Sequence, residues 1–145
     1  MHNILFKTPS NPNEYEQYDY FRWKILRKPL GKTVESLKDS YEESSYHLIG
    51  TLEDEIIACG RLHFNNKTDA QIRYMAVDKE FRGIGIGKKI IKLLELKAKE
   101  KIAKKVILNA RDHVVEFYKK SGYKIVKKYE GSDTGIPHTI MEKKL

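Results

Sequence analysis

Residues Ala76–Lys89 read AVDKEFRGIGIGKK, with glycine at three alternate positions, Gly83, Gly85 and Gly87. A strand-like apolar run leads into this segment, and a helical pattern begins at Ile86. The N–H groups at a helix start and the positive end of the helix dipole attract anions, and glycine lets the backbone approach phosphate oxygens closely. We therefore predict a phosphate-binding loop between a strand and a helix.

Two well-known phosphate loops fit this segment poorly. The dinucleotide fingerprint G-x-G-x-x-G would need its third glycine at Lys88 or Ile90, depending on which glycine is taken first. The P-loop G-x-x-x-x-G-K-S/T is one residue too long for the spacing Gly83–Gly87, and Lys89 stands where it needs a hydroxyl. A tight strand-to-helix turn that merely uses glycine stays open as an alternative.

Hydrophobic periodicity on either side of the glycines predicts a mixed α/β (α+β) chain. Strands are expected over residues 4–8, 46–52, 56–64, 70–77, 106–108, 123–129 and 138–145. Helices are expected over residues 15–26, from 86 toward 101, and around 114–118, with a polar loop or short helix at 32–45. The 145 residues provide for one domain.

The glycine segment resembles a family motif. Arg82-Gly83-Ile84-Gly85-Ile86-Gly87 is similar to the R/Q-x-x-G-x-G/A pyrophosphate loop of the GCN5-related N-acetyltransferase (GNAT) family. Further on, Leu108-Asn109-Ala110 followed by Phe117-Tyr118 and Gly122-Tyr123 is similar to the family's second signature, A…F-Y-x-x-x-G-F/Y. The resemblance covers the chain from its first strand to its last.

The resemblance implies a fold and a co-substrate. The fold would be GNAT-like, with a mostly antiparallel central sheet of about six to seven strands flanked by helices on both faces, in a single N-acetyltransferase domain over residues 1–145. The co-substrate would be acetyl-CoA, with no metal. The implied CoA-binding residues are Met75, Ala76 and Val77 for the pantetheine arm, Arg82, Gly83, Ile84, Gly85, Ile86, Gly87 and Lys88 for the pyrophosphate, and the Asn109 side chain.

Tyr118 corresponds to the tyrosine that many family members use as general acid toward the departing CoA thiolate. A phenol can serve because its ordinary pKa, ~10, lies above that of a thiol, ~8.5. A core aromatic is the alternative, since Tyr118 shares a helical stripe with Val114.

The general base is where the chain departs from the family. Many members carry a glutamate on the fourth strand, but the face of this strand offers Gln71, Arg73 and Met75. The remaining candidates are His138, His63 or a chain of water molecules, and we assign His138 as the candidate base. Cys59 lies in an apolar strand and is interpreted as a packing residue, not as a nucleophile.

The expected reaction is transfer of an acetyl group to a primary amine, by direct attack in a ternary complex. The amine could belong to a small metabolite, a polyamine or a peptide. An acidic loop that would suit a cationic acceptor comprises Glu35, Asp39, Glu42 and Glu43, although a solvated acidic loop is the alternative. A catalytically silent acetyl-CoA sensor and a basic nucleic-acid-binding module are the competing functions.

The charge and the cysteine content limit the classes of partner that the chain is expected to bind. The formal charge of +8 favours anionic ligands, but most lysines fit solvated helix faces without interleaved aromatic residues. Neither nucleic acid nor a membrane is therefore expected as a partner, and the chain is expected to be a monomer or homodimer. A single cysteine excludes a disulfide scaffold, and the lack of a long apolar run or leader pattern predicts a cytoplasmic protein.

Overall fold

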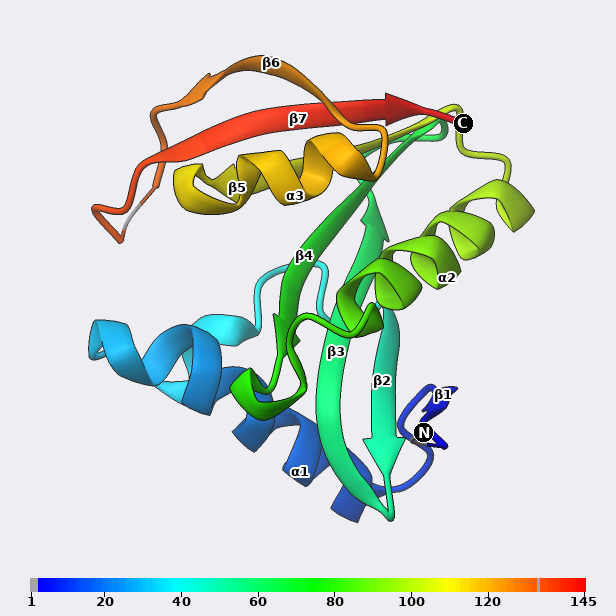
Figure 1. The fold of residues 1–145 in the computed structure, drawn as a ribbon, viewed down its shortest axis with the longest axis vertical. Coiled ribbons are helices and arrows are strands. Elements are labelled where there is room, and N and C mark those ends of the chain that lie inside the picture. The colour runs from blue at the N-terminus through cyan, green and yellow to red at the C-terminus, as the bar shows by residue number, and fades with distance from the viewer. Residues whose placement is uncertain (1–2, 133) are drawn as a thin grey trace.

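A computed structural model describes residues 3–132 and 134–145 (Figure 1). Its strands are β1 (Leu5–Lys7), β2 (Tyr46–Leu52), β3 (Glu55–Phe64), β4 (Asp69–Val77), β5 (Lys105–Arg111), β6 (Lys124–Tyr129) and β7 (His138–Lys144). Its α-helices are α1 (Pro12–Arg22), α2 (Ile86–Glu100) and α3 (Val115–Lys120). Five short helices connect them: η1 (Trp23–Arg27), η2 (Lys28–Leu30), η3 (Val34–Leu37), η4 (Lys79–Phe81) and η5 (Asp112–Val114). The predicted order of elements is confirmed.

The strands form one seven-stranded sheet in the order β1-β2-β3-β4-β5-β7-β6. Neighbouring strands are antiparallel except for β4 and β5, which run parallel. That pair is short, because only residues 69–71 of β4 are in register with residues 105–107 of β5. Figure 1 shows the two strands diverging beyond this point. The sheet is thus opened between the carboxyl ends of β4 and β5.

Helices cover both faces of the sheet, as predicted. On one face, α2 and α3 pack over a large apolar cluster that includes Ala58, Leu62 and Leu108. On the other face, α1 packs Tyr18 and Phe21 over a smaller cluster. Ala58 and Leu62 of β3 belong to the larger cluster and Cys59 belongs to the smaller one, because side chains along a strand point to opposite faces.

The first helix ends earlier than its sequence pattern predicts. Regular α-helix stops at Arg22, and the chain continues through a π-helical turn and a 3-10 turn that ends at Gly31, whose φ is 70°. Pro29 lies within the 3-10 turn, where its ring is incompatible with continued α-helix. The wider π turn brings η1 over β4.

The β2–β3 hairpin turns on two residues, not on the three polar residues that the sequence suggested. Glu53 and Asp54 have φ values of 50° and 66°. Two successive positive φ values match the twist of a two-residue hairpin turn.

Candidate active site

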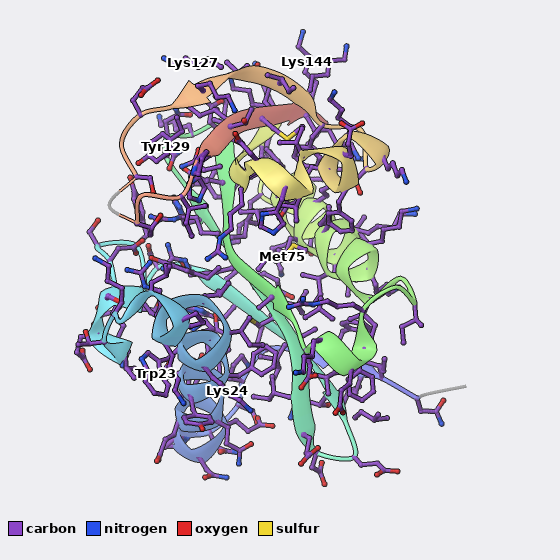
Figure 2. The ribbon with its side chains drawn as sticks, turned by 60° about the vertical axis from the view of Figure 1, so that its left-hand side comes forward. Trp23, Lys24, Met75, Lys127, Tyr129 and Lys144 are labelled. Atoms are coloured by element: carbon purple, nitrogen blue, oxygen red, sulfur yellow. The ribbon has the colours of Figure 1, made fainter. Side chains whose placement is uncertain are left out.

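The opening between β4 and β5 brings the sequence-predicted residues together. β4 borders it with Met75, Ala76 and Val77, β5 with Asn109, and Tyr118 reaches it from α3. The Tyr118 hydroxyl lies 4.0 Å from the Met75 sulfur. Met75 lies at the centre of the molecule in Figure 2. Residues more than 30 positions apart in the sequence, Met75 and Asn109, therefore border one opening.

The glycine loop forms an exposed cradle at the start of α2. Gly83 and Gly85 have φ values of 82° and 90°, a left-handed conformation that favours glycine. Gly85 is the N-cap of α2 and supplies no side-chain cap, so the first N–H groups of the helix lack a partner from a cap side chain. Such groups are suited to a phosphate. Arg82 is exposed and donates from Nε to the carbonyl oxygen of Val77 at 3.1 Å, which ties the loop to the end of β4.

Gly87 has a different role from the two loop glycines. A Cβ at this position would lie 3.1 Å from Phe117 Cζ, so the absence of a side chain lets α3 pack against the first turn of α2. This packing brings α3, and with it Tyr118, close to β4. Lys88 follows on the exposed first turn.

A bulge in β4 changes which side chains share a face. The register with β3 passes from Cys59 opposite Ala76 to Arg61 opposite Arg73, so Tyr74 and Met75 together face one residue. Tyr74 takes a φ of 52° at this point. The bulge reverses the alternation, as expected for one inserted residue.

Met75 consequently does not share a face with Arg73, and the sequence-based expectation on this point was wrong. The Met75 side chain lies on the α2 side, near the positions where Gly60 and Gly87 would carry a Cβ. Arg73 lies on the α1 side, where it pairs with Asp39 at 3.0 Å. Alternation alone could not reveal a bulge.

Tyr118 is a protonated phenol in a half-buried position. Burial raises its pKa from 10.0 to about 12, while the charge of Arg111 acts in the opposite direction. Its ring packs edge-on against Phe117 and Tyr123, with centroids 5.1 and 6.0 Å apart. The side chain is therefore both a packing aromatic and a hydrogen-bond donor at the opening.

The face of β5 opposite α3 carries a second group of polar side chains. Asn109 and Arg111, two positions apart on the strand, share this face, and Arg111 is in register with His138 on β7. His138 Nδ1 lies 2.7 Å from the carbonyl oxygen of Ile136. A carbonyl oxygen only accepts, so Nδ1 donates, and the neutral ring then has its lone pair on Nε2. Sequence reasoning missed Arg111, although its charge directly after the Leu108-Asn109-Ala110 signature could have pointed to it.

His63 and Cys59 lie in environments that suit packing. His63 is 3% exposed and stacks on Tyr41 with ring centroids 4.0 Å apart. Burial lowers the pKa of His63 to about 4, so the ring does not hold a proton near neutral pH. Burial raises the pKa of the Cys59 thiol to about 12, so this thiol is not a ready nucleophile.

Two acids of the loop between α1 and β2 are paired with buried arginines. Glu42 accepts from Arg22 and Arg61, at 2.7 and 3.0 Å, and both guanidinium side chains are fully buried. Asp39 accepts from Arg61 at 2.8 Å and also pairs with Arg73. Burial opposes ionisation of both acids, but the hydrogen bonds from arginine hold the pKa of each carboxyl below its usual value. These two acids anchor the loop to the sheet and are not available to attract a cationic acceptor.

Neither a metal site nor a membrane span is found in the part of the chain that the structure describes. No group of three or more His, Cys, Asp or Glu side chains is placed to hold a metal ion there. No helix within it is both long and apolar enough to cross a bilayer.

The comparison with family models decides the assignment. A model described as the acetyltransferase (GNAT) domain matches residues 14–145. The chain belongs to the GNAT acetyltransferase family. Membership brings with it the reaction class, acetyl transfer from acetyl-CoA, so the implied enzyme class and co-substrate are confirmed.

Individual GNAT proteins agree in sequence and in fold. The chain is 31% identical over 133 residues to the uncharacterized N-acetyltransferase YjcF of Bacillus subtilis (strain 168), covering 92% of this chain and 94% of that protein. A putative N-acetyltransferase from Lactobacillus plantarum superposes with a TM-score of 0.82 at 21% identity, covering 99% and 97% of the two chains. A GNAT acetyltransferase from Elizabethkingia anophelis with acetyl-CoA bound superposes with a TM-score of 0.72 at 24% identity, covering 99% and 97%. The GNAT-like fold predicted from the two motifs is confirmed.

Proposed function

We propose that this GNAT protein transfers the acetyl group of acetyl-CoA to a primary amine by direct attack in a ternary complex. The observation that carries the proposal is the convergence of the glycine loop, the free edge of β4 and the Tyr118 hydroxyl on the β4–β5 opening. Bound acetyl-CoA supplies a thioester whose carbonyl carbon the amine can attack. The chain's own residues bind, orient and move protons around that thioester.

The residues that would hold acetyl-CoA fit its chemistry. Gly83 and Gly85 are exposed, and no heavy atom beyond their chain neighbours lies within 4 Å of where either would carry a Cβ, so a pyrophosphate can approach the backbone between Arg82 and Lys88. Backbone groups of residues 75–77 lie beyond the β4–β5 pairing and can receive the pantetheine amides. Asn109 lies on β5 across the opening and offers an amide that can bond to the same arm.

Tyr118 serves as the general acid in this proposal. It keeps its proton at neutral pH and can donate it to the thiolate sulfur as the carbon–sulfur bond breaks. A phenol with a pKa near 12 is a weaker acid than an exposed tyrosine. Proton transfer is therefore expected to accompany bond cleavage closely, with the hydrogen bond stabilising the thiolate from the start.

His138 serves as the general base. The hydrogen bond from Nδ1 to the Ile136 carbonyl oxygen sets the tautomer in which the neutral ring carries its lone pair at Nε2, and this nitrogen can take a proton from the acceptor ammonium group, which frees the amine to attack. His63 is less suitable, because it is almost fully buried on the α1 face. A chain of water molecules is the alternative route for the proton.

Two measurements test the proposal in sequence. Calorimetry with acetyl-CoA should show saturable binding, and a thiol-release assay over a panel of primary amines should show turnover that depends on the amine. Saturable binding without turnover on any amine would leave the acetyl-CoA sensor as the better description. Binding of an oligonucleotide in place of acetyl-CoA would favour the nucleic-acid module.

The same proposal covers the organisation of the protein. We take residues 1–145 as a single N-acetyltransferase domain that acts as a monomer or homodimer in the cytoplasm, on a small-molecule or peptide amine. Size-exclusion chromatography with light scattering measures the oligomeric state directly.

A further inference from the structure

Arg111, the last residue of β5, differs from the other arginines of the chain because its side chain has no partner among the residues that the structure describes. Those other arginines each donate a hydrogen bond: Arg22 and Arg61 to Glu42, Arg73 to Asp39, Arg27 to Ser36 and Arg82 to Val77. Across residues 3–132 and 134–145, no side-chain hydrogen bond or ion pair reaches the Arg111 guanidinium. The Arg111 guanidinium thus has neither an acid nor a hydrogen-bond acceptor among these residues.

The surroundings of Arg111 are unfavourable for an isolated cation. Its side chain is half-buried, and the charged side chain with the largest effect on its pKa is another cation, Arg27. Burial and the charge of Arg27 both lower the pKa of Arg111. Removing a charge from water without pairing it costs free energy. An anion from outside the chain would offset that cost.

Arg111 lies at the opening where the reaction is proposed to occur. It is in register with His138, so the two side chains share one face of the sheet at neighbouring positions. Tyr118 approaches from α3, on the other face, and is close enough for its phenol to affect the Arg111 charge. Arg111 is therefore beside the proposed base and on the face of the sheet opposite the helix that carries the acid.

The Arg111 cation contrasts with the acids of the loop between α1 and β2. Asp39 and Glu42 are neutralised by arginines of the core, whereas the Arg111 guanidinium adds positive charge beside the proposed base. A purely cationic acceptor such as a polyamine would meet repulsion there. An acceptor with an anionic group would meet attraction.

We propose that Arg111 binds an anionic group, a carboxylate or a phosphate, carried by the acceptor amine, and so selects amines that also bear a negative charge. The planar guanidinium can donate two parallel hydrogen bonds to either group. This inference rests on the proposed acetyl transfer and deepens it by naming the class of acceptor.

The test compares matched pairs of acceptors in the thiol-release assay. One arm sets ω-amino carboxylates against their carboxamides, and the other sets O-phosphoethanolamine against ethanolamine, so that a carboxylate and a phosphate are distinguished. The wild-type chain should favour the anionic member of at least one pair by about 10- to 100-fold in kcat/KM, the range expected for hydrogen bonds to a charged group.

Variants assign that preference to Arg111. Arg111→Gln should remove the preference for the anionic member, mainly by raising KM for that member. Arg111→Lys should retain part of the preference, because the positive charge stays while the two parallel N–H donors of the guanidinium are lost. Lys127→Gln is the control, because it removes one positive charge from the exposed strand β6. This variant should retain the full preference for the anionic member. Unchanged affinity of Arg111→Gln for acetyl-CoA shows that the variant is folded.

The outcomes separate this inference from the proposed function. Equal turnover of neutral and anionic members by the wild-type chain overturns the role of Arg111 while acetyl transfer stands. An equal loss on both members in Arg111→Gln also overturns it, and assigns Arg111 to the thioester instead. Absence of turnover on every amine overturns acetyl transfer, and the acceptor class with it.

Discussion

Tyr118 holds its proton over the whole neutral range, because burial raises its pKa from 10.0 to about 12. The folded pKa is the higher one, so activity that depends on the protonated phenol should persist at neutral pH and fall only as the pH rises toward 12. A rate profile for the amine acceptor should therefore show no decrease from Tyr118 below pH 10.

Tyr118→Phe should reduce kcat by about 100-fold, the lower end of the range for general acid catalysis, with acetyl-CoA affinity unchanged. Full activity in Tyr118→Phe would assign the residue to packing alone.

Gly85 is required by its backbone conformation and not by lack of space. Its φ is 90°, yet no heavy atom beyond its chain neighbours lies within 4 Å of where a Cβ would stand. Gly85→Ala should cost about 1 kcal/mol in unfolding free energy, as the left-handed region is disfavoured for other residues. Because the strained loop would also reorient its N–H groups, acetyl-CoA affinity should fall as well.

Gly31 offers a matched control for that substitution. Its φ of 70° is also left-handed and its Cβ position is equally open, but it ends a 3-10 turn away from the glycine loop. Gly31→Ala should lower stability to a similar extent, measured by denaturant unfolding, and leave acetyl-CoA affinity unchanged. Equal loss of affinity in both variants would mean that Gly85 acts only through stability.

Glu42 links two structural elements, because it joins the loop before β2 to the core. It accepts hydrogen bonds from Arg22 and Arg61, whose side chains are 0% exposed. Glu42→Gln should destabilise the protein by about 1–3 kcal/mol, since two buried cations lose their shared counter-charge while Arg22 keeps Asp19 and Arg61 keeps Asp39. Glu43→Gln, at an exposed neighbouring position, should change the unfolding free energy by less than about 0.5 kcal/mol.

The pH dependence of that contribution has a definite sign. The hydrogen bonds from Arg22 oppose the effect of burial and lower the pKa of Glu42 below its ordinary value of 4.5. Its stabilising contribution is therefore present above pH 4.5 and is lost as the pH falls further. Urea unfolding between pH 3 and 7 should show a steeper decrease for the wild-type chain than for Glu42→Gln. Parallel curves would contradict the ionic role.

The sequence predicts the order of strands and helices well, but it does not predict local departures from regular structure such as the bulge in β4. Strand and helix order follows from hydrophobic periodicity, and the glycine loop follows from its spacing. The bulge at Tyr74 was not predictable, because it depends on the pairing of β4 with β3 and not on β4 alone. The role of Arg111 was equally hidden, since an unpaired arginine is recognised only when the partners of the others are known.

At the scale of the whole molecule, the fold divides the positive charge into separate functions. Arg22 and Arg61 neutralise acids inside the protein, and Lys88 stands on the first turn of α2 beside the glycine loop. Lys99, at the far end of α2, is exposed to solvent. The formal charge of +8 therefore does not imply one basic surface.

This division predicts different effects for two lysines of the same helix. Lys88→Gln should weaken CoA binding about fivefold, the effect of ~1 kcal/mol of attraction between a cation and the ligand phosphates. Lys99→Gln removes the same charge more than two turns away and should leave affinity unchanged. Calorimetry at low and high salt checks both, since the difference between the variants should shrink as salt screens the charges. Equal weakening by the two variants would show that CoA responds to the net charge of the protein and not to the cation at the loop.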